Sequence, residues 1–351
     1  MKVACVTDQH FGARNDSIHF SEYFEKYYSN IFFPYLKKNN IDTVIDLGDT
    51  FDHRKYINYN ILKRSKDMWF DKLADNNIQL HCIVGNHSTY FKNTNSVNSI
   101  DLLTDLYDNV NSYPETQEVN IGGLNMLFIP WINSENNDSS IKKILNSTSK
   151  IAFGHLEVNG FYLNSSIVAK HGLESSIFNK FDSVYTGHFH KKSDNGTIFY
   201  LGTAYQINWS DYGEKKGFHV FDTETLELEF IENPYTILEK IYYDDSKNDY
   251  DNLDVSIYKD KIIKIIVTEK NDLYKFDRFL SRMYNDISTL DIKIIENNDF
   301  DEIEVTGNLD EIDDTASLIT QYIKGTKIDG IENSLLQRKM TELYTEAAEL
   351  L

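Results

Sequence analysis

At 351 residues the chain is longer than one hydrophobic core usually supports, so we expect a main domain and a smaller one. Hydrophobic residues make up 41% and aromatic residues 13%, which is enough for a packed core and excludes a largely disordered chain. The net charge of −20 argues against a stand-alone DNA-binding protein, because contacts with phosphate need Lys and Arg, and it favours a basic partner.

Nothing in the sequence has the pattern of a targeting or membrane segment. The apolar run after Lys2 stops at Val6, and no stretch approaches the roughly 18 apolar residues that a membrane span needs. The two cysteines, Cys5 and Cys82, lie in separate apolar runs, which favours two buried reduced thiols over a disulfide framework. We therefore expect a soluble protein of a reducing cytoplasm.

The first 230 residues alternate short apolar runs with amphipathic stretches, the pattern of a layered α/β fold. The runs predict strands at residues 2–7, 43–47, 79–84, 150–153 and 183–186. Between them, apolar residues recur at helical spacing: Tyr23, Tyr27, Ile31 and Tyr35, then Ile61, Met68 and Leu73, then Ile100, Leu103 and Tyr107. Gly122 and Gly123 predict a hairpin between residues 118–121 and 124–129, and residues 198–231 add further β-rich runs.

A polar, acidic stretch between residues 234 and 260 predicts a domain boundary. Beyond it, residues 261–268, 291–295 and 301–305 indicate strands, and one helix face is marked by Leu273, Phe276, Leu280, Met283 and Ile287. We therefore expect a main domain at residues 1–240, a small α+β domain at 255–308 and a helical tail at 309–351.

The tail ends in a predicted amphipathic helix. Ser334 with Gln337 forms a capping box, and the apolar stripe behind it consists of Leu336, Met340, Leu343, Ala347 and Leu350. This stripe packs on its own domain or docks on another protein, two alternatives of equal weight.

Five short polar motifs stand where predicted strands end. They are Asp8-Gln9-His10, Gly48-Asp49-Thr50-Phe51-Asp52, Gly85-Asn86-His87, Gly154-His155 and Gly187-His188-Phe189-His190. In layered α/β folds the carboxyl ends of strands meet at one crevice, so five such ends can bring these side chains together. The glycines allow sharp turns and a close approach of the following side chain to a ligand.

The residue types predict a centre for two divalent metal ions. Carboxylates, a carboxamide and neutral imidazoles favour manganese, iron, zinc or cobalt over metals that prefer thiolates. One ion needs three or four ligands, whereas seven candidates around a central carboxylate fit two ions: Asp8, His10, Asp49, Asn86, His155, His188 and His190. Two ions about 3.5–4 Å apart clamp both oxygens of a phosphate-ester displacement and supply hydroxide at neutral pH.

Each motif taken alone also has an ordinary structural explanation. Asp49 could cap the following helix, and Asn86 could support a turn. His155 alone is more often a satisfied buried histidine than a metal ligand. His188 and His190 are a stronger signal, since residues i and i+2 of an extended segment face the same way. The joint occurrence of the motifs, each after a predicted strand, favours the metal centre.

Together these motifs resemble the calcineurin-like metallophosphoesterase superfamily, whose pattern is D-x-H, G-D-x-x-D, G-N-H-[D/E], G-H and G-H-x-H. Within it the chain resembles the Mre11/SbcD nucleases, and among them the recombination endonuclease subunits of T4-type phages. Residues 48–55, 129–131, 154–162 and 171–174 carry this closer likeness. The resemblance implies a four-layer αββα sandwich with a smaller C-terminal α+β capping domain and terminal helices.

The resemblance also implies roles for individual residues. One metal ion would be held by Asp8, His10, Asp49 and His190, and Asp49 would bridge to a second ion held by Asn86, His155 and His188. His87 would contact the scissile phosphate and help to protonate the leaving oxygen. The implied cofactors are two divalent ions, Mn²⁺ by preference, with Mg²⁺ and others compatible.

Three residues near these motifs lie outside the predicted set of ligands. Arg54 is a candidate phosphate contact by its charge and fork geometry, and a surface salt bridge explains it equally well. His53 fits an exposed loop histidine better than a site residue. Ser88 stands where the family usually has an acidic residue, and a hydroxyl orients the neighbouring imidazole only weakly, so we expect a less effective acid or a substitute group.

The resemblance implies a manganese-dependent DNA nuclease of recombination and repair, acting as a 3′-to-5′ exonuclease on duplex ends and an endonuclease on single strands. It implies DNA and an SMC-like coiled-coil ATPase of the Rad50/SbcC type as partners, leaves a homodimer open, and places a phage-encoded chain in the host cytoplasm. Two alternatives remain. One is a phosphoesterase of small nucleotides or phosphoproteins, because a metal core does not fix the substrate. The other is a non-enzymatic subunit with structural metals, which only Ser88 supports.

Overall fold

The computed structural model describes residues 1–161, 169 and 172–296, together with residues 323, 335–336, 338–340 and 343. The chain forms two compact units: unit 1 comprises Met1–Ile207 and Gly213–Tyr235, and unit 2 comprises Asn208–Tyr212 and Thr236–Leu351. Among the described residues no helix combines the length and apolarity needed to cross a membrane. The domain limits expected at residues 240, 255 and 309 stay a prediction. The expected strand at 301–305 and the capping box of the tail lie outside the described residues.

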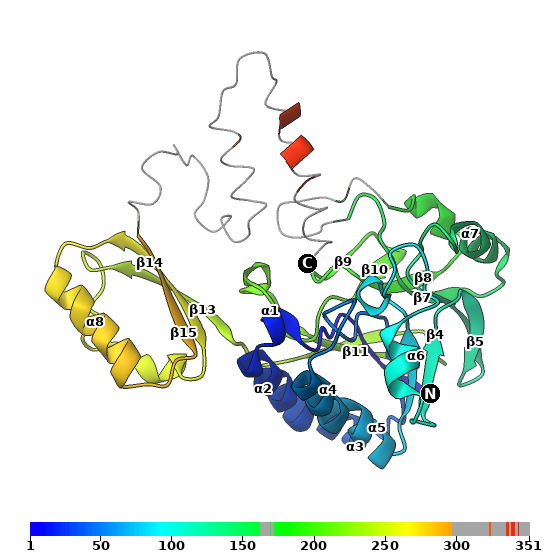
Figure 1. Ribbon diagram of the computed structural model, residues 1–351, viewed down its shortest axis with the longest axis horizontal. Coiled ribbons are helices and arrows are strands. Elements are labelled where there is room, and N and C mark those ends of the chain that lie inside the picture. The colour runs from blue at the N-terminus through cyan, green and yellow to red at the C-terminus, as the bar shows by residue number, and fades with distance from the viewer. Residues whose placement is uncertain are drawn as a thin grey trace. The chain divides into compact units, whose positions relative to one another are not determined.

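Unit 1 is built on two six-stranded sheets (Figure 1). The strands of the first are β1 (Lys2–Val6), β2 (Thr43–Asp46), β3 (Gln79–Ile83), β4 (Val110–Tyr113), β11 (Gly217–Asp222) and β12 (Leu228–Glu232). Those of the second are β5 (Gln117–Ile121), β6 (Leu124–Ile129), β7 (Ile151–His155), β8 (Ser183–Gly187), β9 (Ser193–Asp194) and β10 (Ile198–Tyr200). The orders are β12-β11-β1-β2-β3-β4 and β5-β6-β7-β8-β10-β9. Strands β1 to β4 are parallel, as are β6, β7, β8 and β10, so within each sheet their carboxyl ends lie on one edge.

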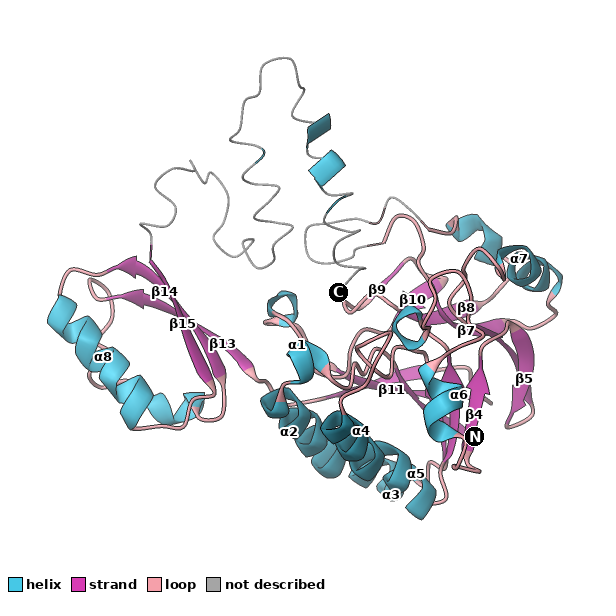
Figure 2. Ribbon diagram, viewed as in Figure 1, coloured by secondary structure: helices cyan, strands magenta, loops and turns pink. Residues whose placement is uncertain are grey.

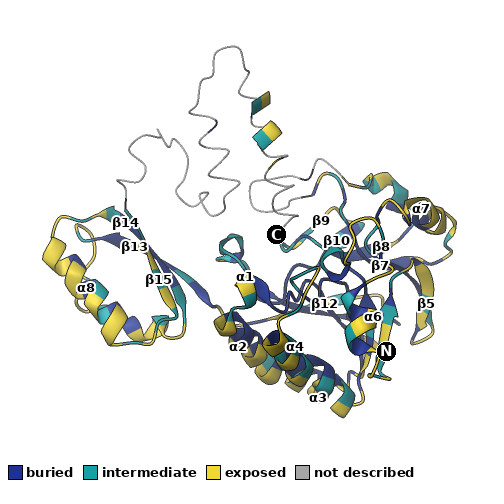
Figure 3. Cartoon of the chain, in the orientation of Figure 1, coloured by how far each residue is buried: buried dark blue, intermediate teal, exposed yellow. Residues whose placement is uncertain are grey.

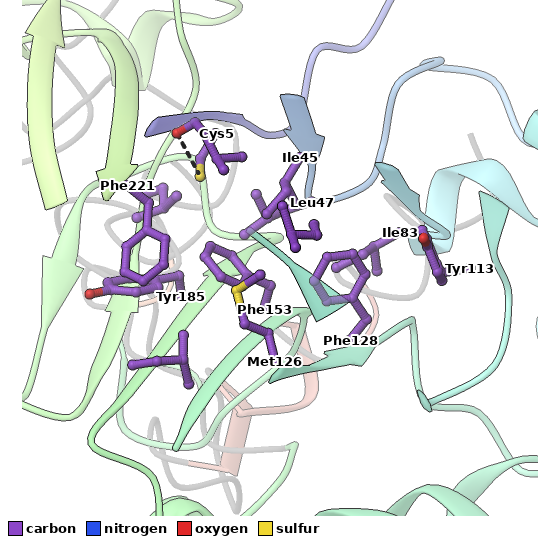
Figure 4. Close-up of a cluster of buried hydrophobic side chains, with 14 residues drawn as sticks. Cys5, Ile45, Leu47, Ile83, Tyr113, Met126, Phe128, Phe153, Tyr185 and Phe221 are labelled. Atoms are coloured by element: carbon purple, nitrogen blue, oxygen red, sulfur yellow. Dashed lines mark hydrogen bonds between the residues drawn. The ribbon is translucent and has the colours of Figure 1, made fainter. Parts of the chain in front are cut away.

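A continuous apolar core lies between the two sheets. Val3 and Cys5 of β1 and Ile45 of β2 meet Phe128 of β6 and Phe153 of β7 in this layer, and all five are fully buried (Figure 4). Alternate residues of the same strands point to the opposite faces, because side chains of a strand alternate between the two sides of its sheet. Both cysteines are buried and free, as predicted.

Helices cover the outer face of each sheet. On the second sheet, α7 (Asn137–Asn146) buries Ile144 against Leu127 and Ala152. On the first sheet, Phe218 of β11 packs edge-on against Phe32, with ring centroids 4.9 Å apart. The remaining helices of unit 1 are α1 (Ala13–Asp16), α2 (Ile18–Tyr27), α3 (Phe33–Asn39), α4 (Tyr59–Ser65), α5 (Asp71–Asp75) and α6 (Ser99–Thr104). The predicted αββα sandwich is therefore confirmed (Figure 2).

A π-helical turn, Tyr28–Phe32, joins α2 to α3 and shifts the buried face of this helical segment. The predicted stripe is right at Tyr23 and Tyr27, which are buried. Within the π turn, Tyr28 and Phe32 are fully buried, whereas the predicted Ile31 in the turn and Tyr35 after it are only partly covered. A π turn adds one residue to a helical turn, so the apolar positions move along the sequence. A second π turn, Lys66–Phe70, between α4 and α5 explains the irregular spacing of the next stripe.

Unit 2 contains a three-stranded parallel sheet of order β13-β14-β15. Its strands are β13 (Leu238–Asp244), β14 (Ile262–Glu269) and β15 (Asp291–Glu296), and α8 (Leu273–Asn285) packs Phe276, Phe279 and Met283 against one face. On α8 these residues are buried, Leu280 and Arg282 are partly buried, and the remaining positions are exposed, so the helix has one buried stripe (Figure 3). The strand at 261–268 was predicted. The predicted helix face is right at Phe276 and Met283, but Leu273 is 64% exposed and the buried Phe279 was missed. β13 was not, because it lies in the stretch interpreted as an acidic link.

Candidate metal centre

Five strand ends bring the predicted ligands together in unit 1. Asp8 and His10 follow β1, Asp49 follows β2, and Asn86 follows β3. His155 is the last residue of β7, and His188 and His190 follow β8. The structure gathers these side chains into two groups, each with ligand atoms within 4.8 Å of one another: Asp8, His10 and His190 in one, and Asp49, His155 and His188 in the other.

The first group is arranged around the carboxylate of Asp8. The Nε2 atoms of His10 and His190 each lie 4.0 Å from Asp8 Oδ1, and they lie 3.1 Å from each other. Asp8 Oδ2 accepts a hydrogen bond from Thr7 Oγ1 at 2.6 Å, and both carboxylate oxygens accept from the amide of His188. Asp8 is fully buried. Its carboxylate is thus fixed in place with two imidazole nitrogens facing the same point.

The second group surrounds the carboxylate of Asp49. His155 Nε2 lies 3.1 Å from Asp49 Oδ2 and 2.9 Å from Asn86 Oδ1, and His188 Nδ1 lies 3.0 Å from the same amide oxygen. His155 Nδ1 donates to the carbonyl of Leu47 at 2.8 Å, which directs Nε2 toward the group. The side chain of Trp131 packs beside His188, with ring centroids 5.1 Å apart.

His87 lies at the edge of both groups. Its amide donates to Asp49 Oδ1 at 2.8 Å, and its Nδ1 donates to the backbone carbonyl of Asp52 at 2.6 Å. Its ring meets that of His10 edge-on at 4.9 Å. Because Nδ1 is committed to the carbonyl, Nε2 is the nitrogen left to exchange a proton with a substrate.

Asp52 is a site residue that the sequence motif contained but to which no role was assigned. Its Oδ1 lies 2.9 Å from His10 Nδ1, so it holds that ring with Nε2 directed at Asp8. Carboxylates that bind the outer nitrogen of a ligating histidine fix its tautomer and orientation. The spacing of the Gly-Asp-x-x-Asp motif was the available signal.

A second buried carboxylate, Asp46, ties the two loops that begin the site. It accepts from Gln9 Nε2 at 2.6 Å and from Thr50 Oγ1 at 2.7 Å, and Tyr28 donates its hydroxyl to the other end of Gln9. Tyr205 bonds the carbonyl of Gln9 at 2.7 Å. Gln9 lies between the predicted ligands Asp8 and His10, and Thr50 follows the predicted ligand Asp49. This network therefore holds the ligand-bearing loops in place.

Four of the predicted ligands have a left-handed backbone. The φ angles are 51° at Asp8, 47° at His10, 55° at Asp49 and 88° at His188. Residues other than glycine rarely occupy this region. Each occurrence costs on the order of 1–3 kcal/mol and persists only where the surrounding structure enforces it. Such strain, concentrated at four positions of one crevice, is typical of a functional site.

The glycines before the ligands provide space that any side chain would fill. A Cβ on Gly85 would stand 2.2 Å from Asp49 Oδ1, and one on Gly48 would stand 2.6 Å from His155 Nδ1. Gly48 also has a φ of +106°, which favours glycine. The close approach predicted for these motifs is thus present at both positions.

The pKa values of the histidines in the centre are shifted in opposite directions. Burial lowers the pKa of His10, but the hydrogen bond that its ring donates to Asp52 and the surrounding carboxylates outweigh it and raise that pKa to about 9. The pKa of His155 is likewise raised to about 9, because Asp49 outweighs the effect of burial. Burial and the charge of His155 lower the pKa of His188 to about 3. The raised pKa values of His10 and His155 thus come from the carboxylates of Asp52 and Asp49, which each histidine contacts directly.

The donor set fits divalent cations. Carboxylate oxygens, one amide oxygen and imidazole nitrogens are the ligands of manganese, iron and zinc, and they point at common positions. His10 Nε2 and His190 Nε2 face each other at 3.1 Å, an arrangement that a shared proton or a cation stabilises. The assignment of individual ligands to either ion stays a prediction.

Three residues next to the candidate ligands, Arg54, His53 and Ser88, make contacts of their own. Arg54 donates from Nε and Nη2 to the carbonyl and Oγ1 of Thr89, at 3.3 and 3.4 Å, so it braces the loop after His87. His53 stacks on Tyr56, with ring centroids 4.5 Å apart, and not on the metal centre. The Ser88 hydroxyl is buried and has no hydrogen-bond partner among the residues that the structure describes, so in this part of the chain it does not orient His87. The backbone carbonyl of Asp52 does so instead.

Comparisons with known proteins agree with this geometry. The profile of calcineurin-like phosphoesterases matches residues 1–192. Exonuclease subunit 1 of Enterobacteria phage T4 is 32% identical over 321 residues, which cover 90% of each of the two chains. A solved structure described as a novel archaeal phosphodiesterase covers 66% of this chain and 100% of its own at 14% identity and a TM-score of 0.34, a likeness too low to carry an argument.

Proposed function

This chain belongs to the calcineurin-like phosphoesterase family and is a metal-dependent phosphodiesterase, and we propose from that premise that its substrate is DNA. In this proposal it acts as a 3′-to-5′ exonuclease on duplex ends and as an endonuclease on single strands, in recombination and repair. Two divalent ions, Mn²⁺ by preference, are its cofactors. The relative that extends over 90% of the chain is itself described as an exonuclease subunit, which supports a nuclease over a phosphatase of small molecules or phosphoproteins.

The observation that carries the proposal is the convergence of seven side chains from five strand ends on one crevice, with His87 at its edge. The two groups contain a carboxylate each, and Asn86 lies within hydrogen-bond distance of both His155 and His188. In this proposal Asp8, His10, Asp49 and His190 would hold one ion. Asn86, His155 and His188, together with Asp49, would hold the second.

Metal ions held there polarise a phosphate ester and make hydroxide available at neutral pH. The chain itself supplies orientation and a proton. Asp52 fixes His10 through its carboxylate and His87 through its carbonyl, so a single loop aligns a ligand and the acid. His87 then gives the proton on Nε2 to the leaving oxygen, a step that typically contributes 10²–10⁴-fold.

A partner completes the proposed enzyme. The chain has 55 Asp and Glu against 35 Lys and Arg, so it provides little positive surface for a long duplex. The T4 relative is described as one subunit of an exonuclease. We therefore include an SMC-like coiled-coil ATPase, bound by the C-terminal region, as the source of further DNA contacts. The protein then works in the host cytoplasm if it is phage-encoded.

The test is degradation of an end-labelled linear duplex with Mn²⁺, by the full chain with and without the ATPase. Asp49→Asn is expected to lower the rate by about 10³-fold or more, because it removes a charge that both ions require, and His87→Ala by about 10²–10⁴-fold. Matched controls on the surface are Asp182→Asn and His19→Ala, which are expected to retain the full rate.

Equal degradation by Asp49→Asn and the unmodified chain would reject the site. A substrate panel decides the class of substrate: cyclic nucleotides, a phosphopeptide and DNA at equal concentration. Faster turnover of either of the first two would reject DNA as the substrate and leave the phosphodiesterase chemistry intact.

A further inference from the structure

Two loops lead directly away from the candidate metal centre. One comprises residues 51–59, between β2 and the start of α4, and the other comprises residues 88–98, between His87 and α6. They start at the site itself, since His87 Nδ1 bonds the carbonyl of Asp52. Further out, Arg54 of the first loop bonds Thr89 of the second. The two loops therefore lie side by side next to the metal centre.

These loops present exposed aromatic side chains, which we call the aromatic rim: Tyr56, Tyr59, Tyr90 and Phe91. Their exposed fractions are 59%, 88%, 44% and 48%, respectively. The chain contains 23 Tyr and 21 Phe, yet every Tyr and Phe that is exposed in the described part of unit 1 belongs to the rim. Large exposed aromatics grouped in this way mark an interaction site.

The backbone beneath the rim is ordered by its own contacts. The amide of Tyr90 bonds the carbonyl of Val97 at 2.9 Å, and Thr89 pairs with Asn98 as an antiparallel bridge. The rings of Tyr90 and Phe91 meet edge-on at 4.7 Å. Because these contacts fix the loop while the rings stay exposed, the rim is a preformed surface.

The charge of the two loops is opposite to that of the chain. Residues 51–59 contain Arg54 and Lys55 against one acidic residue, Asp52, and residues 88–98 contain Lys92 and no Asp or Glu. Beside the rim itself lie Arg54, Lys55 and Lys92. In a protein of net charge −20, this local positive charge favours a polyanion as the ligand.

We propose that the aromatic rim binds the unpaired bases of single-stranded DNA, and that Arg54, Lys55 and Lys92 contact its phosphates. This inference rests on the proposed nuclease function and adds the part of the substrate that the chain itself recognises. Aromatic side chains stack on any base, and neighbouring cations follow the backbone, which is the usual combination in proteins that bind single strands. Bases of an intact duplex are already stacked on each other, so the rim selects single strands and opened ends.

The experiment measures binding without cleavage. A fluorescent oligothymidylate of about 20 nucleotides and a blunt duplex are titrated with the metal-free full chain, and anisotropy is recorded. Tyr59→Ala and Phe91→Ala are each expected to weaken oligothymidylate binding about tenfold, and the double variant further, with about twofold change or less for the duplex. Tyr59→Phe is expected to keep the affinity, whereas Tyr59→Leu loses it, because stacking needs a ring.

The matched control is Tyr274→Ala, which removes a tyrosine of 74% exposure from α8 and is expected to leave both affinities unchanged. Unchanged oligothymidylate binding by the double variant would overturn the proposal, and so would an equal loss for the duplex. Because no cleavage is measured, a chain that binds single strands but fails to degrade DNA with Mn²⁺ would reject the nuclease function alone.

Discussion

Asp52 contacts two histidines, one through its side chain and the other through its backbone. Its carboxylate lies 2.9 Å from His10 Nδ1, and its backbone carbonyl accepts from His87 Nδ1 at 2.6 Å. The carbonyl contact survives any substitution of the side chain, whereas the carboxylate contact does not. Substitutions of Asp52 therefore disturb the orientation of the predicted ligand His10 and leave the orientation of the proposed acid His87 unchanged.

Asp52→Ala is expected to weaken Mn²⁺ binding about 10–100-fold, because His10 loses the group that fixes its ring. Asp52→Asn keeps an oxygen at the same place and is expected to lose less. Isothermal titration calorimetry with Mn²⁺ measures both, and Asp67→Ala on the surface serves as control. An Asp52→Ala variant with unaltered affinity would show that His10 does not depend on this carboxylate.

Metal binding is expected to strengthen as the pH rises toward about 9. His10 and His155 have pKa values near 9 in the metal-free protein, so at pH 7 both carry a proton that must leave before the nitrogen can ligate. Each proton displaced adds up to about tenfold in affinity per pH unit below that pKa, and the gain levels off above it. Titrations of Mn²⁺ at several pH values in buffers of different ionisation enthalpy count the protons. A pH-independent affinity would contradict the assignment of these two histidines.

The sequence predicted which residues meet, but not how each is held. Residue types and glycines at strand ends pointed to one crevice, since parallel strands align their carboxyl ends. The left-handed φ of Asp8, His10 and Asp49 could not be predicted, because nothing in an aspartate or histidine signals it. The contact between Asp52 and His10 also depends on folding, as 42 residues separate the two in sequence.

At the scale of elements, the end of β8 lies close against the end of β1. A Cβ on Gly187 would stand 1.9 Å from Thr7 Oγ1 and 2.9 Å from Asp8 Oδ2. Thr7 holds the Asp8 carboxylate at 2.6 Å, so any side chain at position 187 displaces a predicted ligand.

Gly187→Ala is expected to lower the thermal midpoint and to abolish tight Mn²⁺ binding, since overpacking typically costs about 1–3 kcal/mol and the clash falls on the Thr7–Asp8 pair. The control is Gly196→Ala, where a Cβ meets nothing within 4 Å but the φ of +88° is unfavourable. That variant is expected to lose about 1–2 kcal/mol and keep its metal affinity. Normal Mn²⁺ binding by Gly187→Ala would mean that the two strand ends can separate freely.

Strands were predicted more closely than helices, and for a physical reason. A buried parallel strand is a short continuous apolar run, which stays visible whatever its neighbours do. The two π turns, Tyr28–Phe32 and Lys66–Phe70, change the helical period locally, and a fixed spacing of 3.6 cannot detect them. β13 was missed because acidic residues dominate the stretch around it, although Ile241 and Tyr243 are buried in the core of unit 2.

At the scale of the whole molecule, every predicted ligand lies in unit 1. Unit 2 has its own core, with Tyr243, Ile265 and Phe279 buried between the sheet and α8. The second unit therefore contributes no described side chain to the metal centre, and the two units are expected to respond separately to substitutions.

Phe279→Asp is expected to unfold unit 2 while unit 1 keeps its chemistry. Phe279 is 1% exposed, and replacing it with a buried carboxylate costs on the order of 3–5 kcal/mol or more. Limited proteolysis should then cleave residues beyond Tyr235, while hydrolysis of bis(p-nitrophenyl) phosphate with Mn²⁺ continues. Tyr274→Asp, at 74% exposure on the same helix, is the control. Loss of hydrolysis in Phe279→Asp alone would show that the metal centre depends on unit 2.

The most direct test of the account is anomalous diffraction at the manganese edge from crystals grown with Mn²⁺. The account predicts two peaks per chain within the seven gathered side chains, with the carboxylate of Asp49 in contact with both ions. A single peak would contradict it, as would two peaks that share no carboxylate or any ion bound away from these residues.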